Sequence, residues 1–223
     1  MKTMDRNKTA VRITVAGMAA MTVFTVLKAV FDSLLAASAL IISGIALFFV
    51  VEAVMKTPDA ESGLSFRRFF PDLKKPGVIP LIGFMAALTV AQLYLDKLLF
   101  GKELVEHVLG RAKIMASENV ASVLLNQVFV VVGEEIGFRG FFVGKGMKVV
   151  SFWPAALLSA AVFAAAHFAA GPAAVVACDL GAILIDGVLY ALLYRKTGNC
   201  LISCIPHFAG NMLGYFLVPV IFG

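Results

Sequence analysis

The chain has 223 residues, of which 61% are hydrophobic and 15% charged, and its formal net charge is +5. Soluble domains have roughly 45–50% apolar and about 25% charged residues, so a water-soluble globule, a disordered chain and a protein dedicated to nucleic-acid binding are excluded. All three cysteines, Cys178, Cys200 and Cys204, lie in apolar segments, which excludes a secreted scaffold built on disulfides.

Seven apolar segments have the length, or nearly the length, of about 20 residues that a bilayer-spanning helix needs. They lie at 10–30, 33–55, 78–95, 120–143, 152–171, 173–194 and 200–222. No clear small-residue cleavage site precedes Lys28, so we predict that the first segment is a retained helix and not a signal peptide. The predicted fold class is all-α, a multispanning transmembrane helix bundle. Residues 1–119 hold the N-terminal spans and loops and 120–223 a C-terminal helix bundle, within one continuous membrane domain.

Two stretches fall between the spans. Residues 57–77 contain Pro71, Pro76 and paired basic residues and predict a loop, either a plain linker or one that rests on anionic headgroups. In residues 96–118 apolar side chains recur near the helical period beside charged ones, which predicts an amphipathic helix on the outer face of the membrane. We expect His107, within this helix, to be exposed and functionally silent.

The basic residues are distributed unequally between the two ends of the spans. Most lie on the side of the N-terminus, in the first residues, in 56–77 and after the fourth and sixth spans. The other side holds five: Lys28, Lys97, Lys102, Arg111 and Lys113. Because Lys and Arg collect in cytoplasmic loops, we predict a cytoplasmic N-terminus and a C-terminus on the opposite face.

Ionisable groups inside a span cost several kcal/mol unless they are paired or hydrated, which makes each a functional candidate. The first three spans offer little beyond Glu52 and Gln92, close to their ends. The last four spans carry Glu134, Glu135, Arg139, His167, Asp179, Asp186, His207 and Asn211. Any chemistry is therefore expected in spans four to seven.

The fourth span contains two adjacent glutamates and one arginine. Glu135 and Arg139 are four residues apart, so their side chains meet on one helix face and neutralise each other. Glu134 points about 100° away and has no cation at helical spacing. A carboxyl of this kind suits a general base, which takes a proton from water and returns it to a leaving group. The alternative is that both glutamates only hold helices together through Arg139.

Two hairpins each place a pair of polar residues at the same height. A turn near 151–154 places Glu134 level with His167, and a bend near 197–199 places Asp186 level with His207, which shares a helix face with Asn211. This set suits peptide hydrolysis, with Glu134 activating a water that His167 holds and with His207 and Asn211 donating hydrogen bonds to the oxyanion. A covalent route is poorly supported because the sequence lacks a G-x-S-x-G motif.

At these residues the sequence resembles the CPBP family, which contains CAAX prenyl endopeptidases, bacteriocin-processing proteins and Abi proteins. Three motifs match in order: E-E-x-x-x-R at 134–139, F-x-x-x-H at 163–167 and H-x-x-x-[ND] at 207–211. The motif-bearing region is about 120–215, and the first three spans carry no family mark.

The resemblance implies an intramembrane glutamic-type endopeptidase whose cavity is reached from the cytoplasmic side or from the bilayer. It assigns water activation to Glu134, its partner role to His167, oxyanion stabilisation to His207 and Asn211, and a supporting pair to Glu135 and Arg139. We therefore expect no cofactor, no nucleic acid, and a membrane peptide or protein as substrate, with or without an attached lipid. We place the protein in a prokaryotic plasma membrane.

Three alternatives stay open at this point. An intramembrane metalloprotease would use His167, His207 and a glutamate such as Glu134 as zinc ligands, with water in the fourth position, although the usual H-E-x-x-H helix is absent. A non-catalytic immunity or adaptor protein would use the motifs for architecture. A proton-coupled transporter would use the buried carboxylates as relays, but it should show comparable features in both halves of the chain.

Overall fold

The computed structural model describes residues 3–58, 61–111 and 119–222, so that Lys2 and Lys113 lie outside the described residues. Every regular element in these residues is helical, which confirms the all-α fold class. In chain order the elements are α1 (Thr3–Phe31), α2 (Leu34–Met55), α3 (Phe69–Leu73), α4 (Val78–Phe100), α5 (Lys102–Arg111), α6 (Val120–Glu135), the π-helix η3 (Ile136–Lys145), the 3₁₀ turn η4 (Gly146–Lys148), α7 (Phe152–Ala166), α8 (Ala173–Thr197) and α9 (Cys200–Phe222).

Six helical segments of the described chain are long and apolar enough to cross a membrane, and a seventh apolar helix is shorter. The six begin with α1, α2 and α4, continue with α6 and its extension to Lys148, and end with α8 and α9. The seventh, α7, has 15 residues and stops before His167, whereas the sequence predicted a span to residue 171. The multispanning bundle is thus confirmed, with one span shorter than expected.

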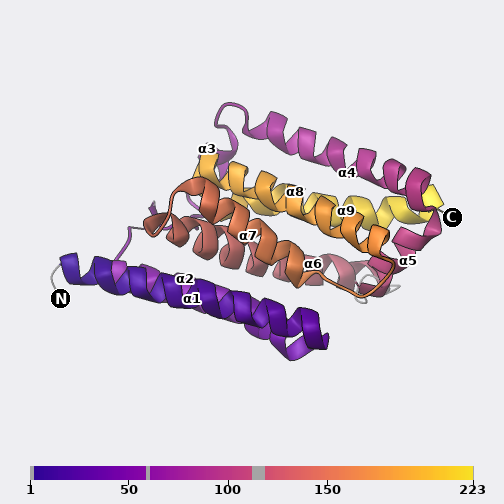
Figure 1. The fold of residues 1–223 in the computed structure, drawn as a ribbon. Helices are drawn as coiled ribbons and strands as arrows, with labels where there is room; N and C mark the ends of the chain where they lie inside the picture. Colours follow the sequence, from indigo (N-terminus) through magenta and orange to yellow (C-terminus); the bar gives the residue numbers. More distant parts are fainter. Residues whose placement is uncertain (1–2, 59–60, 112–118, 223) are drawn as a thin grey trace.

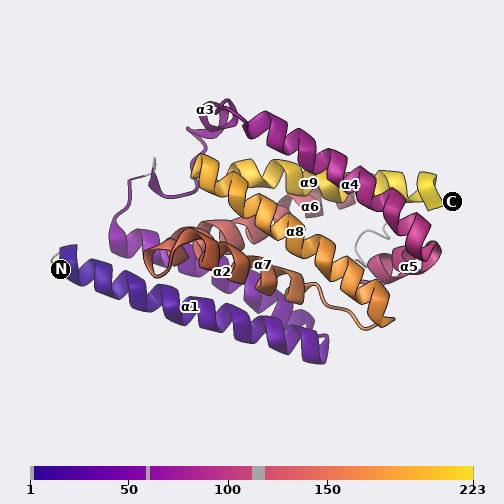
Figure 2. The ribbon, with the colours of Figure 1, turned by 45° about the horizontal axis from the view of Figure 1, so that its top comes forward.

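The helices form a bundle with the α1–α2 hairpin on one side and α4 on the other (Figures 1 and 2). The four helices from α6 to α9 lie between them, with α7 against α1 and α8, and α9 against α4 and α6. The N-terminus lies at one end of the bundle and the C-terminus at the opposite end (Figure 1). The C-terminal half therefore forms the centre of the structure.

The segment predicted as one regular span at 120–143 changes its winding halfway. Asn119 accepts a hydrogen bond from the backbone N–H of Ser122 and begins α6, which continues without a break into η3. π-helical turns insert an extra residue per turn and occur often at functional sites. Nearly every side chain of η3 is buried, and Phe138, Phe141 and Phe142 belong to the main hydrophobic core.

The two stretches between the spans are both packed against the bundle. In 57–77, the Asp72 carboxylate accepts hydrogen bonds from Arg68 and from Asn199 and pairs with Lys75 at 2.8 Å. The predicted amphipathic helix is present as α5. The rest of the predicted segment, 112–118, lies outside the described residues. Val105 of α5 packs with Ile221 and Phe222, so that α5 lies beside the C-terminal end of α9.

Candidate active site

The predicted ion pair between Glu135 and Arg139 lies in the centre of the bundle. Glu135 is the last residue of α6 and Arg139 lies in η3, and both side chains are fully buried. Arg139 Nη1 donates to Glu135 Oε1 at 2.9 Å, and Nη2 donates to the carbonyl oxygen of Gly187 on α8 at 3.3 Å. The guanidinium also lies 4.5 Å from the ring centroid of Phe163. Arg139 therefore joins three helical segments and neutralises one of the two glutamates.

His207 of α9 lies between the two glutamates. Its Nδ1 is 2.8 Å from Glu135 Oε1, and its Nε2 is 3.5 Å from Glu134 Oε2. Because the Glu135 carboxylate already accepts from Arg139, the short contact places a proton on Nδ1 of His207. Tyr190 stacks on the imidazole, with ring centroids 4.8 Å apart. These contacts fix the ring and leave Nε2 directed toward Glu134.

His167 is the C-cap residue that follows α7. Its Nδ1 is 2.8 Å from the carbonyl oxygen of Phe163, one turn earlier. A carbonyl oxygen can only accept, so Nδ1 carries the proton and Nε2 keeps its lone pair. An imidazole in this tautomer can accept a hydrogen bond from a water molecule at Nε2.

Asn211 has a partner that the sequence analysis did not single out. Its Nδ2 donates to Oε1 of Gln127 on α6 at 2.8 Å. Gln127 is buried and precedes Glu134 by seven residues, which is two helical turns, so both side chains lie on the same face of α6. An intramembrane amide at this spacing is the signal that could have revealed it. One N–H of Asn211 is left for another acceptor.

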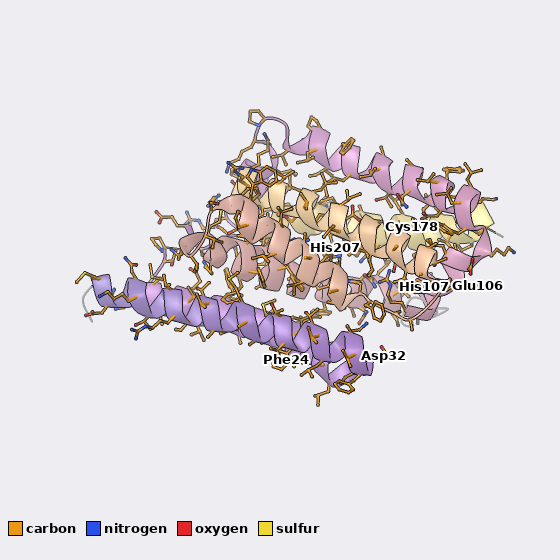
Figure 3. The ribbon with its side chains drawn as sticks, in the orientation of Figure 1. Phe24, Asp32, Glu106, His107, Cys178 and His207 are labelled. Carbon is orange, nitrogen blue, oxygen red and sulfur yellow. The ribbon has the colours of Figure 1, made fainter. Side chains whose placement is uncertain are left out.

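A cavity of about 660 Å³ brings these groups together. Glu134, His167, His207 and Asn211 all line it, and Gln127 does so as well. Glu134 is 12% exposed, whereas Glu135 and Arg139 lie behind it and do not line the cavity. Figure 3 shows His207 about midway between the ends of the bundle. Beside His207 the cavity therefore brings together the Glu134 carboxyl, the imidazole of His167 and the amides of Gln127 and Asn211, an arrangement capable of general acid–base chemistry on an amide bond.

Three other polar residues do not line the cavity. Asp186 does not line the cavity, and Nδ1 of His207 pairs with Glu135 and not with Asp186. Asp179 accepts from Arg111 of α5 at 2.9 Å. The expectation of an exposed His107 is wrong, because its side chain is 6% exposed and its Nε2 lies 3.5 Å from Asp179 Oδ2. The polar face of α5 is turned toward α8.

The side chains of the site determine whether it could hold zinc. Within residues 3–58, 61–111 and 119–222, no three His, Cys, Asp or Glu side chains are grouped closely enough to hold a metal ion. Nδ1 of His167 faces the carbonyl oxygen of Phe163 and Nδ1 of His207 faces Glu135, so Nε2 is the nitrogen that each imidazole could offer to a metal.

Residues 116–213 match the model of a protein family described as type II CAAX prenyl endopeptidase Rce1-like. The resemblance to the CAAX proteases is confirmed. The match includes all three motifs and every residue of the candidate site, while α1 to α5 lie outside it. Searches of curated proteins and of solved structures find no match. The CAAX protease match and the apolar helices together support a multi-pass membrane hydrolase of the protease class.

Proposed function

We propose that the protein is an intramembrane endopeptidase of the glutamic type, which hydrolyses peptide bonds of membrane-associated substrates without a metal. The observation that carries the proposal is the placement of Glu134 beside His207 Nε2 at the inner end of a cavity that His167 and Asn211 also line. The charge of the neighbouring Glu135 is already neutralised by Arg139, so Glu134 is the acid available for proton transfer.

The proposed reaction begins with a water molecule held between Glu134 and Nε2 of His167. Glu134 takes one proton from the water molecule while the oxygen of that water forms a bond to the carbonyl carbon of the substrate. The carbonyl oxygen becomes an oxyanion, and His207 and the remaining N–H of Asn211 donate hydrogen bonds to it. Glu134 then passes its proton to the amide nitrogen, the oxyanion re-forms the C=O bond as the C–N bond breaks, and a carboxylic acid and an amine leave.

The supporting residues would hold the oxyanion donors in place. His207 can donate to the oxyanion when Nε2 carries a proton, and Glu135, 2.8 Å from Nδ1, fixes the orientation of the ring. Arg139 donates to Glu135 and holds it in place. We propose an N-terminus in the cytoplasm of a prokaryotic cell, and a substrate that is a membrane peptide or protein with or without a lipid.

The decisive experiment compares membrane peptides by mass spectrometry from cells with the intact chain and with Glu134→Gln. This change keeps the shape and much of the hydrogen bonding but removes the base. We expect a set of cleaved peptides to disappear in Glu134→Gln and to persist in the matched control Glu106→Gln, an exposed residue of α5. An unchanged peptide set in Glu134→Gln at equal protein level would contradict the proposal and favour a non-catalytic adaptor.

Metal removal distinguishes the glutamic mechanism from the zinc alternative. We expect full activity after exhaustive chelation of the purified protein and no stoichiometric metal in elemental analysis. Loss of cleavage on chelation that zinc restores would instead assign His167, His207 and Glu134 to a metal.

A further inference from the structure

The cavity extends in one direction from the catalytic cluster. From Glu134 its lining follows α6 back toward Asn126, and from His207 it follows α9 forward to Phe222. The remaining walls come from Lys28 near the end of α1, from the last turns of α4, from α5 and from the end of α7. All of these described segments belong to the end of the bundle at which the C-terminus lies (Figures 1 and 2).

The opposite direction is closed by the packed core. Immediately behind Glu134 and His207 lie Glu135, Arg139, Ile202 and Ser203, each with no exposed surface. Phe138 and Phe142 of η3 fill the next layer and are almost wholly buried. A peptide therefore cannot approach Glu134 from the end that holds the N-terminus without disrupting this core.

The two ends of the bundle also differ in charge. The end with the N-terminus carries most of the described basic residues: Arg6, Lys8, Arg12, Lys56, Arg67, Arg68, Lys74, Lys75, Lys145, Lys148, Arg195 and Lys196. At the end toward which the cavity runs, the described basic residues are Lys28, Lys97, Lys102 and Arg111. Basic residues of short loops collect on the cytoplasmic side, so the cavity end is the one assigned to the opposite face.

We propose that substrate reaches the cavity, and the Glu134 carboxyl at its inner end, from the non-cytoplasmic face of the membrane. The cleavage itself rests on the proposed function; the side of access rests on the cavity and the charges. This differs from the cytoplasmic access that the family resemblance implies.

The proposal narrows the class of substrate. Leu93, Leu104, Val105, Val108 and Val130 supply much of the cavity wall, which suits an apolar peptide segment. Such a segment would be the outward half of a membrane-spanning peptide or an apolar tail inserted from the outer face. A lipidated tail that stays on the cytoplasmic surface would meet the closed end of the bundle.

The test maps the two ends with a membrane-impermeant maleimide applied to intact cells. Leu109→Cys places a thiol on the cavity wall at a position that is 42% exposed. Phe70→Cys is the matched control, because Phe70 is also a large apolar side chain, is 69% exposed and lies on α3 at the other end. Thiols that the impermeant reagent has not blocked are then tagged after permeabilisation. The parent chain with its three native cysteines gives the background labelling.

We expect Leu109→Cys to be blocked by the reagent in intact cells and Phe70→Cys to react only after permeabilisation. The reverse pattern, reaction of Leu109→Cys from both sides, or no reaction from either side would overturn the proposal. If Leu109→Cys lowers expression, Glu106→Cys on the same helix reports the same end. Labelling needs no catalysis, so the pattern should be identical in the Glu134→Gln background. A failed cleavage test and a failed access test are therefore distinguishable.

Discussion

At the scale of single residues, the site separates two adjacent carboxyls into different roles. Glu135 accepts from Arg139 and pairs with His207, and it is fully buried. Glu134 lines the cavity, where its nearest charged partner is His207 Nε2 at 3.5 Å. Removing one member of a buried ion pair leaves an uncompensated charge and is strongly destabilising. Arg139 and Glu135 are thus better suited to holding the site together, and Glu134 to exchanging protons.

The first prediction at this scale concerns Gln127, a positioning residue for Asn211. Gln127→Met removes the acceptor of the 2.8 Å hydrogen bond and lets the amide of Asn211 rotate, whereas Gln127→Glu in its protonated form keeps a carbonyl oxygen there. If losing this hydrogen bond removes about 1 kcal/mol of transition-state stabilisation, kcat should fall about five-fold in Gln127→Met, with KM little changed.

The readout is cleavage of a peptide identified by the Glu134→Gln comparison. We expect Gln127→Glu to recover most of kcat and both variants to keep the thermal midpoint of the parent chain. Equal losses of kcat in Gln127→Met and Gln127→Glu would mean that Gln127 does not orient Asn211. A change in KM without a change in kcat would mean the same.

The sequence indicated most of this site because its charged residues stand in apolar spans. The three motifs led to Glu134, His167, His207 and Asn211, and these line one cavity. Gln127 was missed because an uncharged amide in an apolar span is a weaker signal than a charged group. The stacking of Tyr190 on His207 could not be anticipated, since it depends on how α8 and α9 pack and not on a spacing within one helix.

At the scale of elements, the π-helix η3 depends on a close approach by α2. A Cβ atom added to Gly44 of α2 would lie 2.8 Å from the Cα of Gly137 in η3, and backbone cannot move aside as a side chain can. Hydropathy predicted where the spans lie because composition determines burial in lipid. It could not predict the π winding of 136–145 or the early end of α7, which depend on hydrogen-bond register.

We therefore expect Gly44→Val to destabilise the bundle through overpacking, by about 1–3 kcal/mol. The measurement is the thermal midpoint in detergent by intrinsic fluorescence or by tryptic resistance. Gly83→Val on α4 is the matched control, because a Cβ at Gly83 meets nothing within 4 Å. If Gly44→Val melted with the parent chain and with Gly83→Val, the α2–η3 contact would not limit stability.

The short helix α3 gives an element-scale prediction about pH. Burial alone would raise the pKa of Asp72, but hydrogen bonds from Lys75, Arg68 and Asn199 outweigh it and lower the pKa below the ordinary 3.8. A carboxylate with a lowered pKa in the folded state contributes stability that is present above the unfolded pKa and is lost as the pH falls through the folded pKa.

The Asp72→Asn variant should therefore melt below the parent chain near neutral pH, and the gap should narrow as the pH falls below about 4. Thermal midpoints measured between neutral and acidic pH check this prediction. Asp5→Asn, at an exposed position of α1, is the control. A gap that stays constant down to the acid limit would show that the charge of Asp72 does not hold α3 against the turn between α8 and α9.

At the scale of the whole molecule, α5 closes one wall of the cavity and is held by contacts from distant parts of the chain. Arg111 and His107 both face Asp179 of α8, and Val105 packs against the end of α9. The sequence predicted the amphipathic character of α5 because that character is local. It misjudged His107, since the partner of the polar face lies 68 residues or more along the chain from Arg111 and His107.

The last prediction tests whether this attachment controls access to the cavity. Asp179→Asn leaves Arg111 without its anion, so we expect a loss of about 2 kcal/mol in stability, since the pair is partly buried. Reaction of Leu109→Cys with maleimide should become faster as α5 loosens.

Adding Arg111→Gln to Asp179→Asn removes the uncompensated cation and should restore part of the thermal midpoint, so the two losses should not add. Glu103→Gln, an exposed change on the same helix, serves as the control and should alter neither rate nor midpoint. Strictly additive losses, or an unchanged labelling rate in Asp179→Asn, would mean that the ion pair does not govern how α5 covers the cavity.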